Sequence, residues 1–330
     1  MQRSAGGDIS LMQPLTVSVV VPVYNSEQTL APLVERLRAV LIDLCPRHEI
    51  ILVNDGSRDD SWGVIAALAQ QVPQVRGINL MRNFGQHNAL LCGIRAAQYD
   101  VVVTIDDDLQ NPPEEIPRLI AKLSEGFDVV YGAPQEMHHG LMRNLASQLT
   151  KLALQGSMGV NIATKVSAFR AFRREVSKAF AGYNGLYVSI DVLLTWGTSR
   201  FSYVAVRHEA RQIGVSNYTV GKLIRHALNM ITGFSVLPLQ IASLIGFAFV
   251  LFGVGVFVIV VGRYLITGES VPGFPFLASI IAIFAGVQLF ALGIMGEYLA
   301  RMHVRLQDRP AYTVREATDD ERHPDDDPAG

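Results

Sequence analysis

The chain of 330 residues has few cysteines and few charged residues. Its two cysteines, Cys45 and Cys92, stand far apart, which excludes a disulfide framework and a cysteine metal cluster, and we expect buried thiols. Charged residues make up 18% of the chain, whereas an ordinary soluble domain has about 25%. The 28 basic and 30 acidic residues leave a net charge of −2, which argues against a nucleic-acid-binding protein. The 49% of hydrophobic residues argues against a fully soluble chain.

Two familiar nucleotide-binding motifs and a signal sequence are also missing. No G-x-G-x-x-G follows the first predicted strand, and no G-x-x-x-x-G-K-[ST] occurs anywhere. A dinucleotide-binding protein and a P-loop NTPase are therefore excluded. Residues 1–13 lack the apolar stretch of a signal peptide, so we expect no signal peptide and a short N-terminal extension over residues 1–14.

The hydrophobic residues are concentrated in two long runs near the C-terminus. Residues 237–261 and 273–296 contain no charged residue. Each run can cross a hydrocarbon core about 30 Å thick, because a helix rises about 1.5 Å per residue. Two buried core helices are the alternative, but core helices rarely run this far without a polar face. We therefore expect two transmembrane helices joined by a short loop.

Basic residues lie on the outer flanks of this pair of spans. They are Lys222 and Arg225 before the first span and Arg301, Arg305 and Arg309 after the second. The loop between the spans carries only Arg263 against Glu269. The positive-inside rule therefore predicts cytosolic termini and a place in the inner or plasma membrane. The cytosolic part then divides into a folded domain at 15–219 and an amphipathic helix beside the membrane at 220–236.

The chain ends in an acidic tail. Residues 315–330 contain seven acidic residues against Arg315 and Arg322, which is a net charge of −5. Charge runs of this kind are typical of solvated, disordered ends. We therefore expect a disordered acidic tail at the end of a cytosolic segment over residues 297–330.

Residues 16–131 alternate between strand and helix patterns. Apolar, β-branched runs predict strands over 17–23, 49–53, 75–80, 101–105 and 127–131. Apolar residues at helical spacing predict helices over 26–44, 62–70 and 85–97, and Asn111-Pro112-Pro113-Glu114-Glu115 opens another. This alternation predicts an α/β fold with a Rossmann-like, mainly parallel sheet and helices on both faces. In such sheets, ligands bind beyond the carboxyl ends of the strands.

Polar clusters follow four of the predicted strands. They are Tyr24-Asn25, Asp55-Gly56-Ser57, Arg82-Asn83 and Asp106-Asp107-Asp108. On an extended backbone Asp106 and Asp108 point the same way, and Gln110 continues that register. Two carboxylates and an amide oxygen suit a hard divalent cation, which would also bind a diphosphate. The alternative is a solvated acidic turn that caps the helix after Asn111.

Together these segments resemble the family 2 glycosyltransferases of GT-A fold. The resemblance rests on Val20-Val21-Pro22-Val23-Tyr24-Asn25, Val53-Asn54-Asp55-Gly56-Ser57, Arg82-Asn83-Phe84-Gly85-Gln86-His87 and Ile105-Asp106-Asp107-Asp108-Leu109-Gln110-Asn111-Pro112-Pro113-Glu114. It continues through Phe169-Arg170, the two spans and Arg309-Pro310-Ala311-Tyr312, and so covers about residues 15–313. The subgroup that it resembles is the polyprenyl-phosphate glycosyltransferases, which include dolichyl-phosphate mannose synthases, bactoprenyl glucosyltransferases and undecaprenyl-phosphate 4-deoxy-4-formamido-L-arabinose transferases.

The resemblance implies a nucleotide-sugar donor bound across the strand ends. The residues implied to bind the donor are Pro22, Tyr24, Asn25, Asp55, Arg82, Asp106 and Asp107. The implied ligands of Mg²⁺ or Mn²⁺ on the diphosphate are Asp106, Asp108 and Gln110. Asp108 and Arg211 are the implied catalytic residues, because a metal ion and an arginine fork stabilise the charge that grows on the leaving diphosphate. The resemblance also implies a homo-oligomer, since relatives are often tetramers.

Three positions depart from the family pattern. Ser26 stands where many relatives have an acid, Gly132-Ala133-Pro134 lacks an arginine, and Thr164 stands near a proposed catalytic aspartate. Catalysis is still expected, because the acceptor is a phosphate monoester with a second pKa near 6. Such a dianion needs positioning more than deprotonation. The cations that are candidates to position it are Arg143, Lys151, Lys165 and Arg170.

We therefore predict a membrane-attached, metal-dependent inverting glycosyltransferase. It would move a sugar, with UDP-sugars favoured by the resemblance, to a polyprenyl phosphate of undecaprenyl type on the cytosolic leaflet, for cell-envelope glycan or lipid modification. Amphipathic stretches over 141–154 and 220–234 would lie in the core or in the membrane interface. One alternative is an inactive membrane scaffold of the same fold, and another is a processive polysaccharide synthase, whose usual Gln-x-x-Arg-Trp motif is missing.

Overall fold

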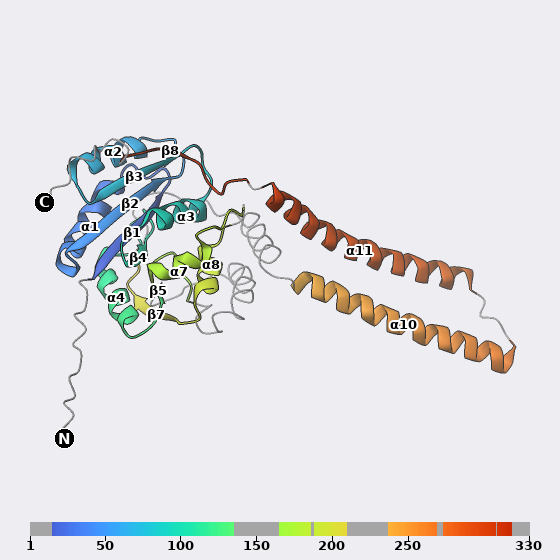
Figure 1. The fold of residues 1–330 in the computed structure, drawn as a ribbon. Coiled ribbons are helices and arrows are strands. Elements are labelled where there is room, and N and C mark those ends of the chain that lie inside the picture. The colour runs from blue at the N-terminus through green and yellow to red at the C-terminus, as the bar shows by residue number, and fades with distance from the viewer. Residues whose placement is uncertain are drawn as a thin grey trace, which may run out of the picture.

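The computed structural model describes residues 15–134, 165–185, 188–209, 237–268, 273–307 and 309–318. In this part of the chain, strands form a sheet in the order β7-β5-β6-β4-β1-β2-β3-β8 (Figure 1). The strands are β1 Thr16–Val23, β2 Arg47–Asn54, β3 Val75–Leu80, β4 Val101–Thr104, β5 Val129–Pro134, β6 Arg170–Arg173, β7 Phe201–Val206 and β8 Val314–Ala317. The helical segments are α1 Leu30–Leu44, α2 Ser61–Gln71, α3 Gln86–Ala96, η1 Pro113–Glu115, α4 Ile116–Ser124, α7 Arg174–Ser177, η2 Lys178–Phe180, α8 Ile190–Gly197, α10 Leu237–Thr267 and α11 Phe274–Leu306.

Most neighbouring strands of the sheet run parallel. β1 pairs in parallel with β2 and β4, β2 with β3, and β5 with β7. β6 is antiparallel to both β4 and β5, and β8 is antiparallel to β3. The predicted α/β fold with a mainly parallel sheet is therefore confirmed, and β1 to β5 coincide with the predicted strands apart from a few end residues.

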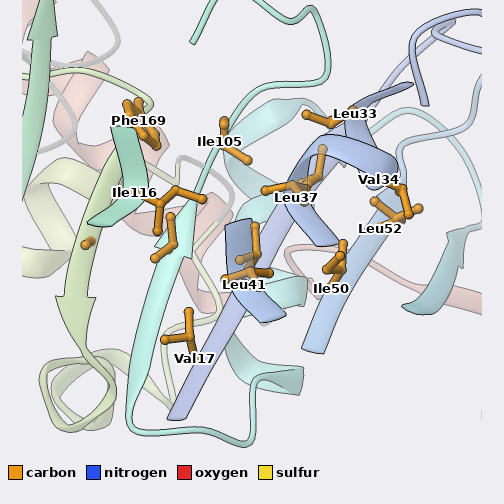
Figure 2. Close-up of a cluster of buried hydrophobic side chains, with 14 of the residues drawn as sticks. Val17, Leu33, Val34, Leu37, Leu41, Ile50, Leu52, Ile105, Ile116 and Phe169 are labelled. Carbon is orange, nitrogen blue, oxygen red and sulfur yellow. The ribbon is translucent and has the colours of Figure 1, made fainter. Parts of the chain in front are cut away.

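Alternating side chains of the strands bind a different set of helices to each face of the sheet. Val19 and Val21 of β1 belong to one core cluster with α1, α2 and α4, whereas Val20 belongs to the other with α3 and α8. Figure 2 shows Leu37 and Leu41 of α1 among side chains of the first cluster that come from the strands, Val17 and Ile50 included. Burying each such side chain contributes about 1.5–3 kcal/mol, so this packing holds the strand ends in place.

The strands β6, β7 and β8 were not predicted from the sequence. β6 and β8 have four residues each, which is too short for a periodic pattern to stand out. β7 lies at one edge of the sheet, and only its first and last residues are buried, with Tyr203 exposed. Their places in the sheet depend on pairing with strands that are distant in sequence.

The two apolar runs form the long helices α10 and α11, which extend away from the sheet as a pair (Figure 1). The rings of Phe249 and Phe284 meet edge to face between them, with centroids 5.9 Å apart. Both helices are long and apolar enough to cross a membrane, over Leu239–Ile266 and Ile283–Leu306. Their large apolar side chains face outward, which is typical of a lipid-facing pair.

The segment after α11 returns to the sheet instead of continuing into solvent. β8 pairs with the edge of β3, and the Thr318 hydroxyl accepts a hydrogen bond from the Gly77 N–H at 2.9 Å. The prediction that the acidic tail is disordered from residue 315 onward was therefore wrong for its first residues. Backbone pairing with an open strand edge outweighs the local preference of a charged segment for solvent.

Candidate functional site

The loop after β1 is held by the loop after β2. Asn25 adopts a left-handed backbone conformation with φ of +53°, and its N–H donates to the Ser57 hydroxyl at 3.0 Å. In return, the Asn25 side-chain oxygen accepts from the Arg58 N–H at 2.8 Å. Pro22 is buried in β1, whereas Tyr24 is exposed beside this loop. We call residues 24–25 and 54–58 together the nucleotide loop, after the prediction that Tyr24, Asn25 and Asp55 bind the donor.

Asp55 ties the nucleotide loop to the segment that follows β3. Its two carboxylate oxygens accept hydrogen bonds from the backbone N–H groups of Phe84 and Gly85, at 2.7 and 2.9 Å. Burial raises the pKa of Asp55 to about 6, against the opposing effect of these two donors. Arg82 lies over the Phe84 ring, with 4.3 Å between its guanidinium carbon and the ring centre. Asp55 therefore holds the segment between β3 and α3 against the loop after β2.

The three consecutive acids lie in a turn after β4. The prediction that Asp106, Asp108 and Gln110 share one side of an extended backbone was wrong, because β4 ends at Thr104 and Leu109 adopts a φ of +60°. The Leu109 side chain is buried in the core, and this burial accounts for the turn despite its backbone strain.

The turn still brings the carboxylates together. Burial and the nearby charges of Asp108 and Asp107 raise the pKa of Asp106 to about 7. The Asp106 carboxylate accepts from the Gln86 amide at 2.7 Å, and Asp107 accepts from the Ser26 hydroxyl and the Tyr24 N–H. The turn therefore places Asp107 against the loop after β1 and Asp106 against Gln86 of α3.

The donor set of this turn fits a hard divalent cation. Asp106 and Asp108 supply carboxylate oxygens, and the Gln110 amide donates to Asp108 at 2.8 Å, which leaves its own oxygen as a further ligand atom. A cation bound in this turn would relieve the mutual repulsion between the acids. No group of three or more His, Cys, Asp and Glu side chains suited to a metal occurs in the described part of the chain. A site in this turn therefore depends on two acids and an amide.

Arg170 is a buried cation close behind the acidic turn. It is 1% exposed, its guanidinium is paired with Asp191, and its charge opposes the rise in the pKa of Asp106. The Tyr131 hydroxyl also donates to Asp191, at 3.2 Å. Lys165 lies elsewhere, with its ammonium 5.6 Å from the ring centre of exposed Tyr203. Of these two candidates for the acceptor phosphate, Arg170 is already bound to an internal partner.

The segment that follows β7 contacts the acidic turn. The Glu209 N–H donates to the Gln110 carbonyl at 2.8 Å, and the Glu209 carboxylate lies 3.5 Å from Arg36. Arg207, directly after β7, pairs with the buried Glu115 at 2.7 Å. Six other predicted features lie outside the described residues: Arg211, Arg143, Lys151, Thr164 and the two amphipathic stretches over 141–154 and 220–236.

Several residues that shape the site were not singled out from the sequence. They are Gln86, Asn54, Asn79 and Asp191, whereas Ser26 was noted only as a departure from the family pattern. Gln86 and Asn54 stand inside quoted motifs, so their position was a usable signal. Asn79 and Asp191 carry no such signal, because only the fold brings them next to their partners.

Comparison with known proteins identifies relatives over nearly the whole chain. Residues 18–180 match the family model described as Glycosyl transferase family 2. The chain is 36% identical over 303 residues to the undecaprenyl-phosphate 4-deoxy-4-formamido-L-arabinose transferase of Shewanella sediminis, with 91% of this chain and 92% of that protein covered. It is 37% identical over 302 residues to the protein of the same name from Pseudomonas syringae, with 90% and 89% covered.

One solved structure adds support for the fold. The glucosyl-3-phosphoglycerate synthase of Mycobacterium tuberculosis, in complex with Mn²⁺, UDP-glucose and phosphoglyceric acid, matches with a TM-score of 0.50 and 22% identity. The match covers 66% of this chain and 78% of that chain. Together with the family match, it confirms the predicted GT-A fold of the sheet and its helices.

Proposed function

Because this chain belongs to glycosyl transferase family 2, we propose that it transfers a sugar from a nucleotide-sugar, with UDP-sugars favoured, to polyprenyl phosphate at the cytosolic leaflet. The observation that carries this proposal is the gathering of Asp55, Asp106, Asp107 and Asp108 around neighbouring loops at the carboxyl ends of β1, β2 and β4. Relatives named undecaprenyl-phosphate 4-deoxy-4-formamido-L-arabinose transferase support an undecaprenyl-type acceptor. The two apolar helices would keep the enzyme beside that lipid.

The nucleotide loop and the acidic turn would bind the two parts of the donor. Pro22, Tyr24, Asn25, Asp55 and Arg82 surround the base and ribose in this proposal, with Asp107 holding the first loop through Ser26 and the Tyr24 N–H. Exposed Tyr24 can stack on a base, and Arg82 supplies positive charge beside the phosphates.

Asp106, Asp108 and Gln110 would hold a divalent cation, Mg²⁺ or Mn²⁺, against the diphosphate. When bound, such a cation stabilises negative charge on the leaving nucleoside diphosphate. Arg211 is proposed to add a second positive charge from the segment that follows Glu209 in sequence. Gln86 and Arg170 then orient and balance Asp106 from the protein side.

The transfer itself needs no general base. An oxygen of the acceptor phosphate forms a bond to the anomeric carbon while the bond from that carbon to the diphosphate oxygen breaks on the opposite face, which inverts the configuration. The acceptor is largely dianionic at neutral pH, so the protein has to position it. We propose Lys165, Arg143 and Lys151 for this contact. Arg170 is assigned a positioning role, because Asp191 already pairs with it.

The direct test is the variant Asp108→Asn. We expect loss of transfer by about 100-fold or more, because the metal site loses one of its two carboxylates. The measurement is the formation of organic-extractable product from labelled nucleotide-sugars and undecaprenyl phosphate, together with Mn²⁺ binding. Asp100→Asn is the matched control, since Asp100 precedes β4 at the opposite end and bonds to the Thr16 hydroxyl.

Two outcomes would contradict the proposal. Full activity in Asp108→Asn would refute the metal assignment. If the unmodified protein binds UDP with Mn²⁺ but forms no product from any donor in a panel of nucleotide-sugars, the chain is an inactive scaffold of the same fold. A homotetramer and cytosolic termini stay predictions that this assay does not address.

A further inference from the structure

A row of hydrogen bonds runs from β8 to the nucleotide loop, through two side-chain amides and two backbone N–H groups. The Asn79 amide of β3 donates to Glu316 of β8 at 2.7 Å, and the Asn54 amide of β2 donates to Asn79 at 2.8 Å. The Ser57 N–H donates to the Asn54 side-chain oxygen at 3.3 Å, and the Asn25 N–H donates to the Ser57 hydroxyl at 3.0 Å. We call these five residues the relay; it crosses four neighbouring strands or their ends.

The carboxylate of Glu316 favours one orientation of the two amides in the relay, the same orientation that the Ser57 N–H requires at the other end. A carboxylate accepts hydrogen bonds and does not donate them, so the NH₂ group of Asn79 has to face it. The Asn79 oxygen then faces Asn54, and the Asn54 oxygen faces the Ser57 N–H. Hydrogen bonds that run in one direction polarise one another, and a charged acceptor at the end strengthens them.

The middle of the relay is buried, so its amides depend on one another. Asn54 is 3% exposed and Asn79 is 7% exposed. A buried amide that loses its partner has no solvent to replace it. Turning one amide over, or removing its partner, is therefore unfavourable. Glu316 itself is exposed and forms part of a short strand, so its replacement does not open the core.

We propose that Glu316 is a positioning residue for donor binding, acting through Asn79 and Asn54 on the conformation of the nucleotide loop. The inference rests on the proposed function, because it takes residues 24–25 and 54–58 as the binding site of the nucleotide. It gives the C-terminal segment after α11 a role at the donor site, through the pairing of β8 with β3. The strained backbone of Asn25 is the end of the relay and the part that most needs support.

Three substitutions at one position test the direction of the relay. Glu316→Gln keeps an acceptor and should bind UDP nearly as well as the unmodified chain. Glu316→Ala removes the acceptor and should weaken UDP binding about three- to tenfold, as expected for one lost hydrogen bond. Glu316→Lys presents only donors, which favours reversal of both amides and sets the Asn54 NH₂ against the Ser57 N–H, so it should weaken binding most.

The measurement is isothermal titration calorimetry with UDP and Mn²⁺ on the full-length protein in detergent, alongside the thermal unfolding midpoint. Thr318→Val is the matched control, because it removes the bond to the Gly77 N–H without touching the relay. It should lower the midpoint and leave UDP affinity unchanged. In transfer assays, Glu316→Ala should raise the KM for the donor and leave the KM for undecaprenyl phosphate and kcat nearly unchanged.

The failure of the relay is distinguishable from the failure of the proposed function. If the unmodified protein binds UDP and forms product, equal UDP affinity in Glu316→Ala, Glu316→Lys and the unmodified chain would overturn the relay alone. Equal loss of affinity in Thr318→Val and Glu316→Ala would also overturn it, since β8 would then act only as a structural strand. If the unmodified protein neither binds UDP nor transfers any sugar, the proposed function is what fails.

Discussion

At the scale of single residues, the contact between the loop after β2 and the segment after β3 depends on two neighbouring residues, Asp55 and Gly56. Gly56 has a φ of +63°, and a Cβ atom there would lie 2.5 Å from the Asn83 nitrogen. The neighbouring Asp55 carboxylate bonds to the backbone of the same segment at Phe84 and Gly85. Glycine at position 56 thus permits the close approach that aspartate at position 55 secures.

Gly56→Ala is expected to disrupt this contact. Any side chain pays about 1–2 kcal/mol for the left-handed conformation, and the clash with backbone adds about 1–3 kcal/mol. Gly126→Ala is the control, because Gly126 has a φ of +101° but nothing within 4 Å of the added Cβ. The thermal unfolding midpoint and UDP affinity should both fall more in Gly56→Ala. Equal effects of the two substitutions would show that the contact with Asn83 is unimportant.

At the scale of elements, a buried ion pair connects β5, β6 and α8 behind the acidic turn. Arg170 of β6 pairs with Asp191 of α8, and Tyr131 of β5 donates to the same carboxylate. The ion pair holds β6, which is antiparallel to both β4 and β5, against α8 on one face of the sheet. A short strand that carried little signal in the sequence is thereby held by one charge interaction.

Asp191→Ala should destabilise the protein by about 3–5 kcal/mol, because it leaves the Arg170 charge buried and unpaired. Tyr131→Phe should cost only about 1 kcal/mol, since it removes one neutral donor. The double variant Arg170→Met with Asp191→Leu should recover much of the loss. Thermal unfolding in detergent measures all three. If Asp191→Ala is no worse than Tyr131→Phe, the ion pair does not stabilise this part of the sheet.

A second charge cluster joins η1, α4 and the end of β7. Glu115 is buried and pairs with Arg118 at 2.6 Å and with Arg207 at 2.7 Å. Burial opposes ionisation, but the hydrogen bonds from Arg207 and Arg118 outweigh it and hold the pKa of Glu115 below its ordinary value of 4.5. Because the pKa of Glu115 is lower in the folded state than in the unfolded state, Glu115 stabilises the fold at pH values above its ordinary pKa. That contribution disappears as the pH falls through the lowered pKa.

Arg207→Ala should therefore destabilise the protein most at neutral pH. The difference in unfolding midpoint from the unmodified chain should shrink as the pH falls below about 4.5, where Glu115 loses its charge in the unfolded state and then in the folded state. In a Glu115→Gln background, the same substitution should have an effect that is nearly independent of pH. A constant difference in both backgrounds would rule out Glu115 as the titrating partner.

At the scale of the whole molecule, the chain leaves the α/β domain for the helical pair and then returns to it. α10 and α11 extend away from the sheet, and β8 then pairs with β3 (Figure 1). The chain after α11 therefore adds a strand to the same sheet that β1 to β7 form.

Both native thiols are buried, and burial raises the pKa of Cys45 to about 11 and that of Cys92 to about 12.

These unreactive thiols allow a test of orientation with single added cysteines. Ser270→Cys, between the two spans in the sequence, should react with a membrane-impermeant maleimide in intact bacterial cells. Ser199→Cys, at an exposed site in the α/β domain, should react only after the cells are permeabilised. The unmodified chain should remain unlabelled in both cases. Labelling of Ser199→Cys in intact cells would place the α/β domain outside and contradict the cytosolic site of transfer.

Local patterns in the sequence were sufficient for the core of the fold. The apolar runs of β1 to β5, the spacing of apolar residues in α1 to α4 and the two uncharged runs near the C-terminus each carry their signal within a short window. Hydrophobic periodicity depends on the immediate chain, so it predicts an element without knowledge of its partners. The order of motifs at the strand ends likewise indicated the family, and the comparison with known proteins confirmed the class of protein.

Only the tertiary structure decided how those loops hold one another. The turn at Asp106–Gln110 depends on burial of Leu109, the pairing of Arg170 with Asp191 depends on a helix packed against a short strand, and the return of Glu316 to the sheet depends on the open edge of β3. Each of these features depends on a partner that is distant in sequence or on burial in the packed core. Since their free energy comes from groups that only the folded chain brings together, no local pattern records them.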